Sequence, residues 1–474
     1  MKSILLPLLT CFSLNILSAA TVIEDQRTID ILTPSLADRK TLKLRLDNGL
    51  EAYLISDPQT EKSGAVLSMR VGSWNDPAEH PGMAHFLEHM LFLGTTQYPI
   101  EGDFQRYVSD HGGEMNAFTT NVYTSYAFTI NNNALEEGLD RFSSFFKDPL
   151  FNPSGVSREL RAIDQEYAKN LESDDIRMLY VHKALANPQH PNQRFGMGNS
   201  KSLLNTTQEA LRTWYNENYS ANLMRLMIVS PLPLKELEQL VVNDFSAIVN
   251  RNKQEFTSIE PSTAHTMKGK IVYIEPIKDV RKLLLVWELP PAFAEMKETK
   301  PDSLLCHVLG HEGQESILAQ LKRQKLADSL SCGGSKLGGQ NVELFLEIGL
   351  TEKGLTDVNN VILTCFQTLA LLKKTGVPET IFKEIQQVQT INYNYQQREK
   401  LFMFLMTNGM QLNDEALATY PEQSKIVQRY DADAINTLIA ELTHERAHYY
   451  LLAPSSETKI LFDAKPEAWS VKVQ

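Results

Sequence analysis

The fold is indicated by an apolar strand pattern that occurs twice in the chain. The first copy is Gly64-Ala65-Val66-Leu67-Ser68-Met69-Arg70-Val71, and the second is Lys282-Leu283-Leu284-Leu285-Val286-Trp287. A helical pattern follows each copy, from Pro81 to Phe92 in the first case and from Pro301 to Leu309 in the second. Because the same elements recur in the same order, we predict a structural duplication.

A pair of glycines extends this correspondence. His111-Gly112-Gly113 precedes an extended region at 114–130, and Cys332-Gly333-Gly334 precedes a strand pattern at 342–347. Strands and helices are mixed without a regular β-α alternation, which is typical of an α+β fold. We therefore predict two homologous α+β domains, each a mostly antiparallel sheet with helices packed on one face. Two unrelated α+β domains are the alternative.

Composition suggests the limits of these domains. Residues 250–268 are polar, contain Pro261 and lack apolar periodicity, so we interpret them as a linker. This interpretation places the first domain at 40–249 and the second at 269–474. A polar leader covers residues 21–39.

The first 20 residues are typical of a secretory signal peptide. Lys2 provides a positive start, residues 4–17 are mostly apolar, and Ser18-Ala19-Ala20 supplies small residues for cleavage. A buried N-terminal helix is one alternative. Lipid attachment at Cys11 is another, although this cysteine lies inside the apolar run. No later stretch is long and apolar enough to span a bilayer, so we expect an exported protein, periplasmic or secreted.

Charge and cysteine content exclude several classes of protein. The 474 residues include 46 basic and 58 acidic side chains, a net charge of −12. This balance argues against a nucleic-acid partner, because phosphate binding needs clustered Lys and Arg. Four cysteines are too few for a disulfide-built scaffold. After export, Cys306, Cys332 and Cys365 would remain, which allows one disulfide at most.

The chemistry is concentrated in His85-Phe86-Leu87-Glu88-His89. On a helix, His85, Glu88 and His89 lie along one stripe, so both imidazoles can ligate one metal ion. Glu88 would then be close enough to take a proton from a zinc-bound water. The spacing is that of the inverted zinc-protease motif His-x-x-Glu-His.

A hydrolytic zinc site also needs a third protein ligand and one open position. The helical pattern from Val156 to about Tyr180 contains Glu159 and Glu166, which are seven residues apart and share a helix face. Taken alone, each of these glutamates is more typical of a solvated helix charge.

From about Leu42 to Trp469, the chain resembles the pitrilysin and insulin-degrading enzyme family of zinc metallopeptidases. That family has a glutamate ligand on a later helix, and Glu166 lies 77 positions after His89. The resemblance implies one Zn²⁺ per chain, bound by His85, His89 and Glu166. It also implies that Glu88 is the catalytic base and that Glu159 supports the site without binding the metal.

The segment 112–119 resembles the active-site edge strand of this family. The resemblance implies that Asn116 contacts the substrate near the scissile carbonyl and that Ala117 offers main-chain hydrogen bonds. Phe118 and Phe92 would line an apolar pocket, although the two residues by themselves fit a core equally well. Leu87 stands where insulin-degrading enzymes carry a cysteine, so the motif looks more like the pitrilysin branch.

The second copy lacks the complete set of zinc-site residues. His307 and His311 are again four apart, but Gly310 stands where Glu88 stands in the first copy. Val388, 77 positions after His311, offers no carboxylate. We expect these histidines to be structural or part of an exosite. The resemblance implies an inactive domain with a remote exosite that anchors a substrate N-terminus, formed by Gly310, His311, Glu312 and Gly313.

Full-length members of the family have four homologous domains in two halves that close on a chamber. The segment 467–469 resembles the start of their inter-half linker, so this chain would be the N-terminal half of a clam-shell chamber. We expect a zinc metalloendopeptidase for short or unfolded peptides. A second chain carrying the missing half, or a homodimer, would complete the chamber. The alternative is a half-chamber peptide-binding module with little or no catalysis.

Overall fold

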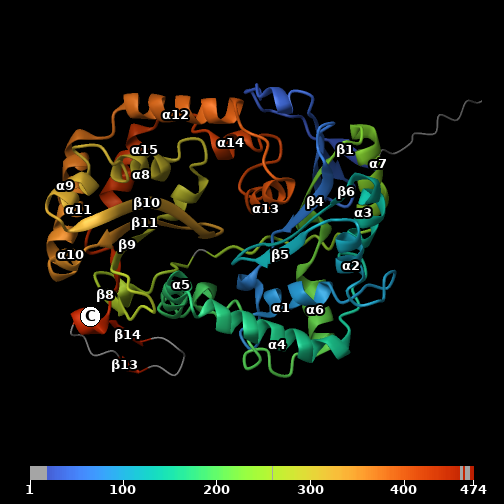
Figure 1. The fold of residues 1–474 in the computed structure, drawn as a ribbon, viewed down its shortest axis with the longest axis horizontal. Coiled ribbons are helices and arrows are strands. Elements are labelled where there is room, and N and C mark those ends of the chain that lie inside the picture. The colour runs from blue at the N-terminus through green and yellow to red at the C-terminus, as the bar shows by residue number, and fades with distance from the viewer. Residues whose placement is uncertain (1–18, 259, 459–462, 465–469, 474) are drawn as a thin grey trace, which may run out of the picture.

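The protein consists of two seven-stranded sheets with helices around them (Figure 1). The computed structural model describes residues 19–258, 260–458, 463–464 and 470–473. Residues 1–18, which hold most of the predicted signal peptide, and the linker-like segment 467–469 lie outside the described residues. In Figure 1 the first sheet lies on the right and the second on the left.

The first sheet has the strand order β1-β2-β3-β7-β4-β6-β5. Among its described neighbours, only β3 and β7 are parallel, and the other pairs are antiparallel. The edge strand β5 pairs with β6 from Met115 opposite Phe128 to Thr119 opposite Thr124. The strands are β1 Ala20–Val22, β2 Lys40–Leu46, β3 Glu51–Ser56, β4 Lys62–Met69, β5 Met115–Thr119, β6 Thr124–Asn131 and β7 Met224–Ser230.

The second sheet repeats this arrangement with the order β10-β11-β9-β12-β8-β14-β13. Its first five strands correspond in turn to β5-β6-β4-β7-β3, and the corresponding pair β12 and β8 is parallel. The predicted duplication is therefore confirmed. The strands are β8 Ile271–Ile274, β9 Lys282–Leu289, β10 Ala327–Gly338, β11 Asn341–Leu350, β12 His448–Leu452, β13 Asp463–Ala464 and β14 Ser470–Val473.

The two glycine pairs are not equivalent, contrary to the expectation from the sequence. Gly112 and Gly113 lie in the turn before β5, whereas Gly333 and Gly334 lie inside β10. A Cβ at Gly333 would come within 2.7 Å of the Phe345 ring, so a glycine is needed there for cross-strand packing. The region 114–130 also forms a hairpin of two strands, β5 and β6.

One face of each sheet carries helices from its own half of the chain. The apolar face of the first sheet packs against helices α1 Met83–Leu91, α2 Asp103–Asp110, α3 Leu135–Ser144, α6 Gln208–Asn218 and α7 Leu234–Phe245. The corresponding face of the second sheet packs against α8 Pro301–Leu309, α9 Ile317–Arg323, α11 Val358–Thr375 and α15 Ala432–Glu441.

Other helices cross between the halves. In Figure 1 the pair α4 and α5 runs along the bottom of the molecule, and α12 runs along the top. The helical pattern expected from Val156 to about Tyr180 is two helices, because the chain turns at Leu171 and the Ser173 hydroxyl caps a new helix. The remaining helices are α4 Pro153–Asn170, α5 Asp174–Ala184, α10 Glu352–Thr356, α12 Glu379–Asn394, α13 Leu401–Gln411, α14 Glu422–Lys425 and α16 Ser455–Thr458.

The halves exchange helices across their second faces. Helix α5 of the first half packs Tyr180 and Val181 against the second sheet. Helix α13 of the second half packs Leu405 against β4 and β6 of the first sheet. Each sheet therefore buries a helix from the opposite half, and these two contacts hold the domains together.

The leader at 21–39 adds a further connection. After β1, the backbone amides of Thr28 and Ile29 donate to the carboxylate of Glu422 in α14 at 2.6 and 2.9 Å.

In the second half, a disulfide joins Cys306 of α8 to Cys332 of β10. Cys365 is a buried free thiol.

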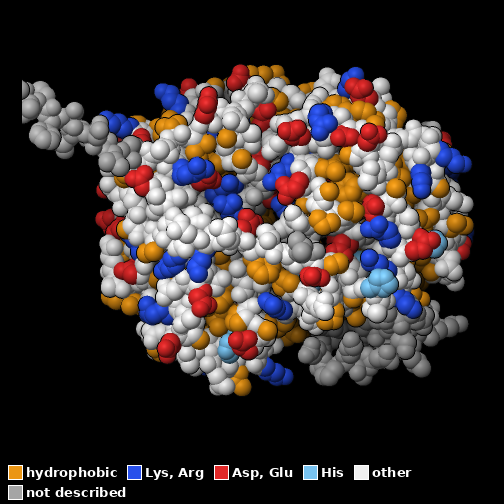
Figure 2. Space-filling view, turned by 180° about the vertical axis from the view of Figure 1, so that it is seen from behind, with side chains coloured by type: hydrophobic (Ala, Val, Ile, Leu, Met, Phe, Trp, Pro, Cys, Tyr) orange, Lys and Arg blue, Asp and Glu red, His pale blue; other side chains and the backbone are white. Residues whose placement is uncertain are grey.

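None of the helices among the described residues is both long and apolar enough to cross a membrane. On the face shown in Figure 2, basic and acidic side chains are intermixed. That face therefore carries no extended field of one sign, the kind of surface that attracts nucleic acid.

Candidate metal centre

Helix α1 is oriented by its apolar side chains. Phe86, Leu87 and Met90 are fully buried in the first core. The opposite side of the helix faces α4 and β5. This orientation places His85, Glu88 and His89 on one side, and their ligand atoms all lie within 4.8 Å of one another.

The start of α1 is held by a residue that sequence reasoning missed. The carboxylate of Asp76, which is 2 % exposed, accepts hydrogen bonds from the backbone amides of Gly82 at 2.6 Å and Ala84 at 2.8 Å. Gly82 has φ +98°, and a Cβ there would lie 2.3 Å from the Cα of Gly198. The helix start is thus fixed by a distant carboxylate and by close contact with the 196–198 turn.

Glu166 of α4 faces both histidines. Its Oε2 lies 3.5 Å from Nε2 of His85 and 3.8 Å from Nε2 of His89. The two rings stand perpendicular with centroids 4.9 Å apart. Two imidazole nitrogens and one carboxylate oxygen therefore converge on a common point, as a catalytic zinc site requires.

The other ring nitrogens of the two histidines face acceptors. Nδ1 of His85 lies 2.7 Å from the carbonyl oxygen of Met197, and Nδ1 of His89 lies 3.3 Å from Oε2 of Glu159. An acceptor at Nδ1 assigns the proton to that atom, so the Nε2 lone pairs point towards Glu166. The hydrogen bond to His89 lowers the pKa of Glu159, which keeps this carboxyl charged. The residues present thus fit a zinc ion, both in the donor atoms they offer and in the hydrogen bonds that orient the two histidine rings.

Glu88 differs from Glu166 in its surroundings. Its side chain is buried, and burial raises the pKa of its carboxyl. The hydroxyl of Thr119, another residue that the sequence reasoning missed, donates to its Oε2 at 2.6 Å. A buried carboxylate with a raised pKa beside a metal site is a suitable proton acceptor.

A cavity of about 860 Å³ surrounds these groups. All residues expected at the metal and substrate sites of the first domain line it: His85, Glu88, His89, Phe92, Asn116, Ala117, Phe118, Glu159 and Glu166. Asn116 is exposed and Phe118 is half-buried. Phe92 has both expected roles, because it lines the cavity and also packs on Tyr126 and Phe145.

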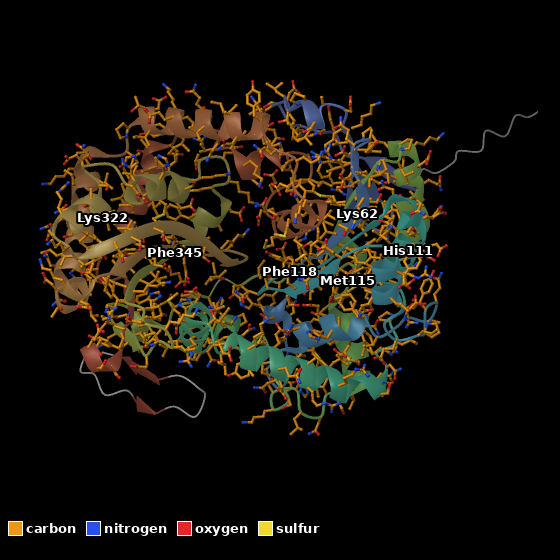
Figure 3. The ribbon with its side chains drawn as sticks, viewed as in Figure 1. Lys62, His111, Met115, Phe118, Lys322 and Phe345 are labelled. Carbon is orange, nitrogen blue, oxygen red and sulfur yellow. A yellow bond between two sulfur atoms is a disulfide. The ribbon has the colours of Figure 1, made fainter. Side chains whose placement is uncertain are left out.

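The edge strand β5 runs beside this cavity. In Figure 3 it extends from the side of His111, through Met115, towards Phe118, and Phe345 of β11 is labelled in the opposite half. Among the described strands, only β6 pairs with β5. The outer edge of β5 therefore offers main-chain groups to an extended peptide.

The residues expected at the exosite lie elsewhere. Gly310, His311, Glu312 and Gly313 follow the end of α8, and none of them lines the cavity around His85. The rings of His307 and His311 are exposed, with centroids 6.3 Å apart. Nδ1 of His311 accepts a hydrogen bond from the amide of Gly313 at 2.9 Å.

Comparison with known proteins assigns the chain to a family. Residues 52–193 match the sequence model described as Insulinase (Peptidase family M16), and residues 205–389 match the Peptidase M16 inactive domain. The chain belongs to the insulinase family, peptidase family M16. The second M16 match begins before β7, so it includes the end of the first sheet.

Several relatives are about one third identical to this chain over the aligned residues. The A-factor-processing enzyme of Saccharomyces cerevisiae is 33 % identical over 443 residues, which are 91 % of this chain and 43 % of the yeast protein. The insulin-degrading enzyme of Homo sapiens is 34 % identical over 440 residues, 90 % of this chain and 43 % of the human protein. The chain thus spans less than half the length of these relatives.

Two solved structures show the same architecture. Pitrilysin superposes with a TM-score of 0.91 and 27 % identity, over 96 % of this chain and 49 % of pitrilysin. The first half of the periplasmic protease PqqL from Escherichia coli has a TM-score of 0.71 over 93 % of this chain and 96 % of that structure. At 18 % identity, the second comparison concerns the fold alone.

Proposed function

We propose that this M16 chain is the catalytic half of a zinc metalloendopeptidase that cleaves short or unfolded peptides. The observation that carries the proposal is the convergence of Nε2 of His85, Nε2 of His89 and Oε2 of Glu166 beside the buried Glu88. We further propose that the chain holds one zinc ion and is exported to the periplasm or outside the cell, as its first 20 residues suggest.

In this proposal each residue of the centre has a separate task. His85, His89 and Glu166 would hold the ion, and Glu159 would orient the His89 ring through Nδ1. When bound, zinc supplies Lewis acidity, which polarises the scissile carbonyl and lowers the pKa of a water to about 7. Glu88 accepts the proton of the attacking water and delivers it to the leaving amine.

The substrate would lie extended along β5. An extended peptide can add to an open sheet edge through main-chain hydrogen bonds, which makes recognition broad in sequence. Asn116 and Ala117 would supply contacts near the scissile bond, while Phe118 and Phe92 would form an apolar pocket in the cavity. Gly310, His311, Glu312 and Gly313 remain a proposed exosite for the substrate N-terminus.

We propose that a second half faces this one and completes the chamber. The chain spans 43 % of the human relative and 49 % of pitrilysin. We therefore propose a second chain carrying the missing half, or a second copy of this one. Closure of the chamber would exclude water and strengthen the charge interactions at the centre.

The test is the substitution Glu88→Gln, which preserves shape and leaves the three proposed ligands in place. We expect retained zinc and peptide binding, with a loss of turnover on the order of 10²–10⁴. Cleavage is followed by mass spectrometry of a peptide mixture, and zinc by elemental analysis. Glu136→Gln, an exposed carboxyl of α3 that does not line the cavity, is the matched control and should keep full activity.

Two results would contradict the proposal. Unchanged turnover in Glu88→Gln would exclude Glu88 as the base. No turnover in the parent chain, either alone or with a completing half, would favour the peptide-binding module instead.

A further inference from the structure

A second group of histidine and glutamate side chains lies between the two halves, away from the candidate centre. His182 of α5, Glu343 of β11 and His448 of β12 have ligand atoms within 4.8 Å of one another. Register places the two strand residues on one face, because Glu343 opposes Glu288 of β9 and His448 opposes Val286 of the same strand. This is the face on which α5 packs.

Two residues of this group, His448 and Glu343, have buried polar atoms without a hydrogen-bond partner. His448 is 1 % exposed, and neither of its ring nitrogens has a hydrogen-bond partner. Oε1 of Glu343, which is 5 % exposed, lies 3.3 Å from Nε2 of His182 without forming a hydrogen bond. Buried polar atoms are almost always paired, so the unpaired nitrogens of His448 and the unpaired Oε1 of Glu343 indicate a missing partner.

A neighbouring carboxylate shows what ordinary pairing looks like on the same face. Oε1 of Glu288 accepts from the amide and hydroxyl of Ser262 at 2.5 and 2.9 Å, and its Oε2 accepts from the amide of Thr263 at 3.1 Å. Among the described residues, no backbone amide or hydroxyl donates such a hydrogen bond to Oε1 of Glu343. Lys183, the cation next to His182, points away and donates to Asn121 at 2.8 Å.

The two imidazole rings lie side by side next to Glu343. Nδ1 of His182 lies 2.8 Å from the hydroxyl of Tyr450, so its Nε2 is turned towards Glu343. The ring of His448 is parallel to that of His182 with centroids 5.7 Å apart.

We propose that His182, Glu343 and His448 form a second, structural metal site for a divalent ion of the zinc class. Two imidazole nitrogens and a carboxylate oxygen are a donor set that zinc accepts. The ion would neutralise Glu343 and supply the partner that His448 lacks. It would tie α5 of the first half to two strands of the second sheet, and so fix the packing of the halves.

The test uses a chain in which the candidate active centre cannot bind metal. In His85→Ala/His89→Ala, we expect about one zinc per chain after saturation and dialysis, measured by elemental analysis. Adding Glu343→Gln or His448→Gln should lower this content about tenfold or more. Adding Glu288→Gln, the matched carboxylate with capped oxygens, should leave it unchanged. Circular dichroism checks the fold of each variant.

Two further measurements complete the test. Zinc should raise the thermal midpoint of His85→Ala/His89→Ala and should not raise it after addition of Glu343→Gln, because a ligand stabilises only the fold that binds it. If the Glu343 and His448 variants fail to fold, anomalous diffraction at the zinc edge on parent crystals decides, with a peak expected between the three side chains.

A folded His85→Ala/His89→Ala chain without zinc, or a map without that peak, would overturn the proposal. The group would then be an ion pair of protonated His182 with Glu343. This test does not depend on peptidase activity.

Discussion

The hydroxyl of Thr119 donates a 2.6 Å hydrogen bond to Oε2 of Glu88. Thr119 is the last residue of the edge strand β5, and Glu88 lies in α1 between the two histidines. This bond joins the strand proposed to bind the peptide to the helix proposed to carry the catalytic residues. Because a donor favours the charged carboxylate, Thr119 opposes the rise in the pKa of Glu88 that burial causes.

Replacing this hydroxyl should change the pH dependence of catalysis. In Thr119→Val the pKa of Glu88 should rise further, so the acidic limb of kcat/KM should move up by about one pH unit or less. Thr119→Ser keeps the hydroxyl and should keep the parent profile. The measurement is a pH–rate profile on the active assembly, and superposable profiles for Val and parent would refute the role of the bond.

Removing Glu159 should weaken zinc binding without removing a ligand. Glu159→Ala leaves Nδ1 of His89 without its acceptor, and such losses typically cost about 10–100-fold in metal affinity. Competition with a chromophoric chelator measures the affinity. Arg161→Ala, an exposed position on the same helix, is the control and should bind zinc as the parent does. Equal affinities for all three chains would show that Glu159 is only a surface charge.

Asp57 should make stability depend on pH. Its carboxylate is 2 % exposed and accepts from Arg39 at 2.7 Å and from Arg398 at 2.6 and 3.0 Å. Burial alone would raise the pKa of Asp57, but these two arginines outweigh it and lower the pKa below its ordinary 3.8. Stability from this group is thus present above pH 3.8 and is lost as pH falls through the lowered value.

The substitution Asp57→Asn should therefore cost about 1.5–3 kcal/mol in the free energy of unfolding at pH 7. The difference from the parent should shrink as pH drops below 3.8. Urea unfolding at a series of pH values measures it, down to the lowest pH at which the fold persists. Asp38→Asn, on an exposed carboxyl nearby, should have no such effect, and a pH-independent difference for Asp57→Asn would contradict the linkage.

Leu405 should be critical for the attachment of α13 to the first sheet. Its side chain is fully buried, and a Cβ at Gly64 of β4 would lie 2.7 Å from its Cδ1. Leu405→Ala should lower the free energy of unfolding by about 2–5 kcal/mol because it leaves a cavity between the halves. Leu371→Ala, on a 58 % exposed leucine of α11, should change it by about 0.5 kcal/mol or less. Equal effects in thermal or urea unfolding would show that α13 is not a core element.

Local pattern was sufficient for the elements that depend on short-range periodicity. The strand at 64–71 is β4 with its end at Met69, and the helix expected from Pro301 to Leu309 has those limits in the structure. His85, Glu88 and His89 share a stripe because α1 turns once per 3.6 residues, whatever packs around it. Apolar alternation likewise predicted the duplicated strands, since a half-buried strand repeats every two residues.

Tertiary structure decided which distant residues meet. The sequence predicted that Glu159 and Glu166 share one face of a helix. Only the packing of α4 on α1 places Glu159 beside Nδ1 of His89 and Glu166 beside Nε2 of His85. The break between α4 and α5 was invisible to periodicity, because the apolar pattern continues through it. Asp76, Thr119 and the Met197 carbonyl carry no local signal at all.

The contact between the two halves shows most clearly what sequence pattern predicts and what only tertiary packing decides. His182 and His448 are separated by 266 positions, and Glu343 comes from a third segment. Each is an ordinary residue in its own helix or strand, so its sequence neighbours say nothing about the others. The chain by itself determined two similar domains and a helix with zinc-protease spacing, because these follow from spacing within one element. Only the packing of α5 on the second sheet brought the second group together, since burial between domains depends on how whole elements pack.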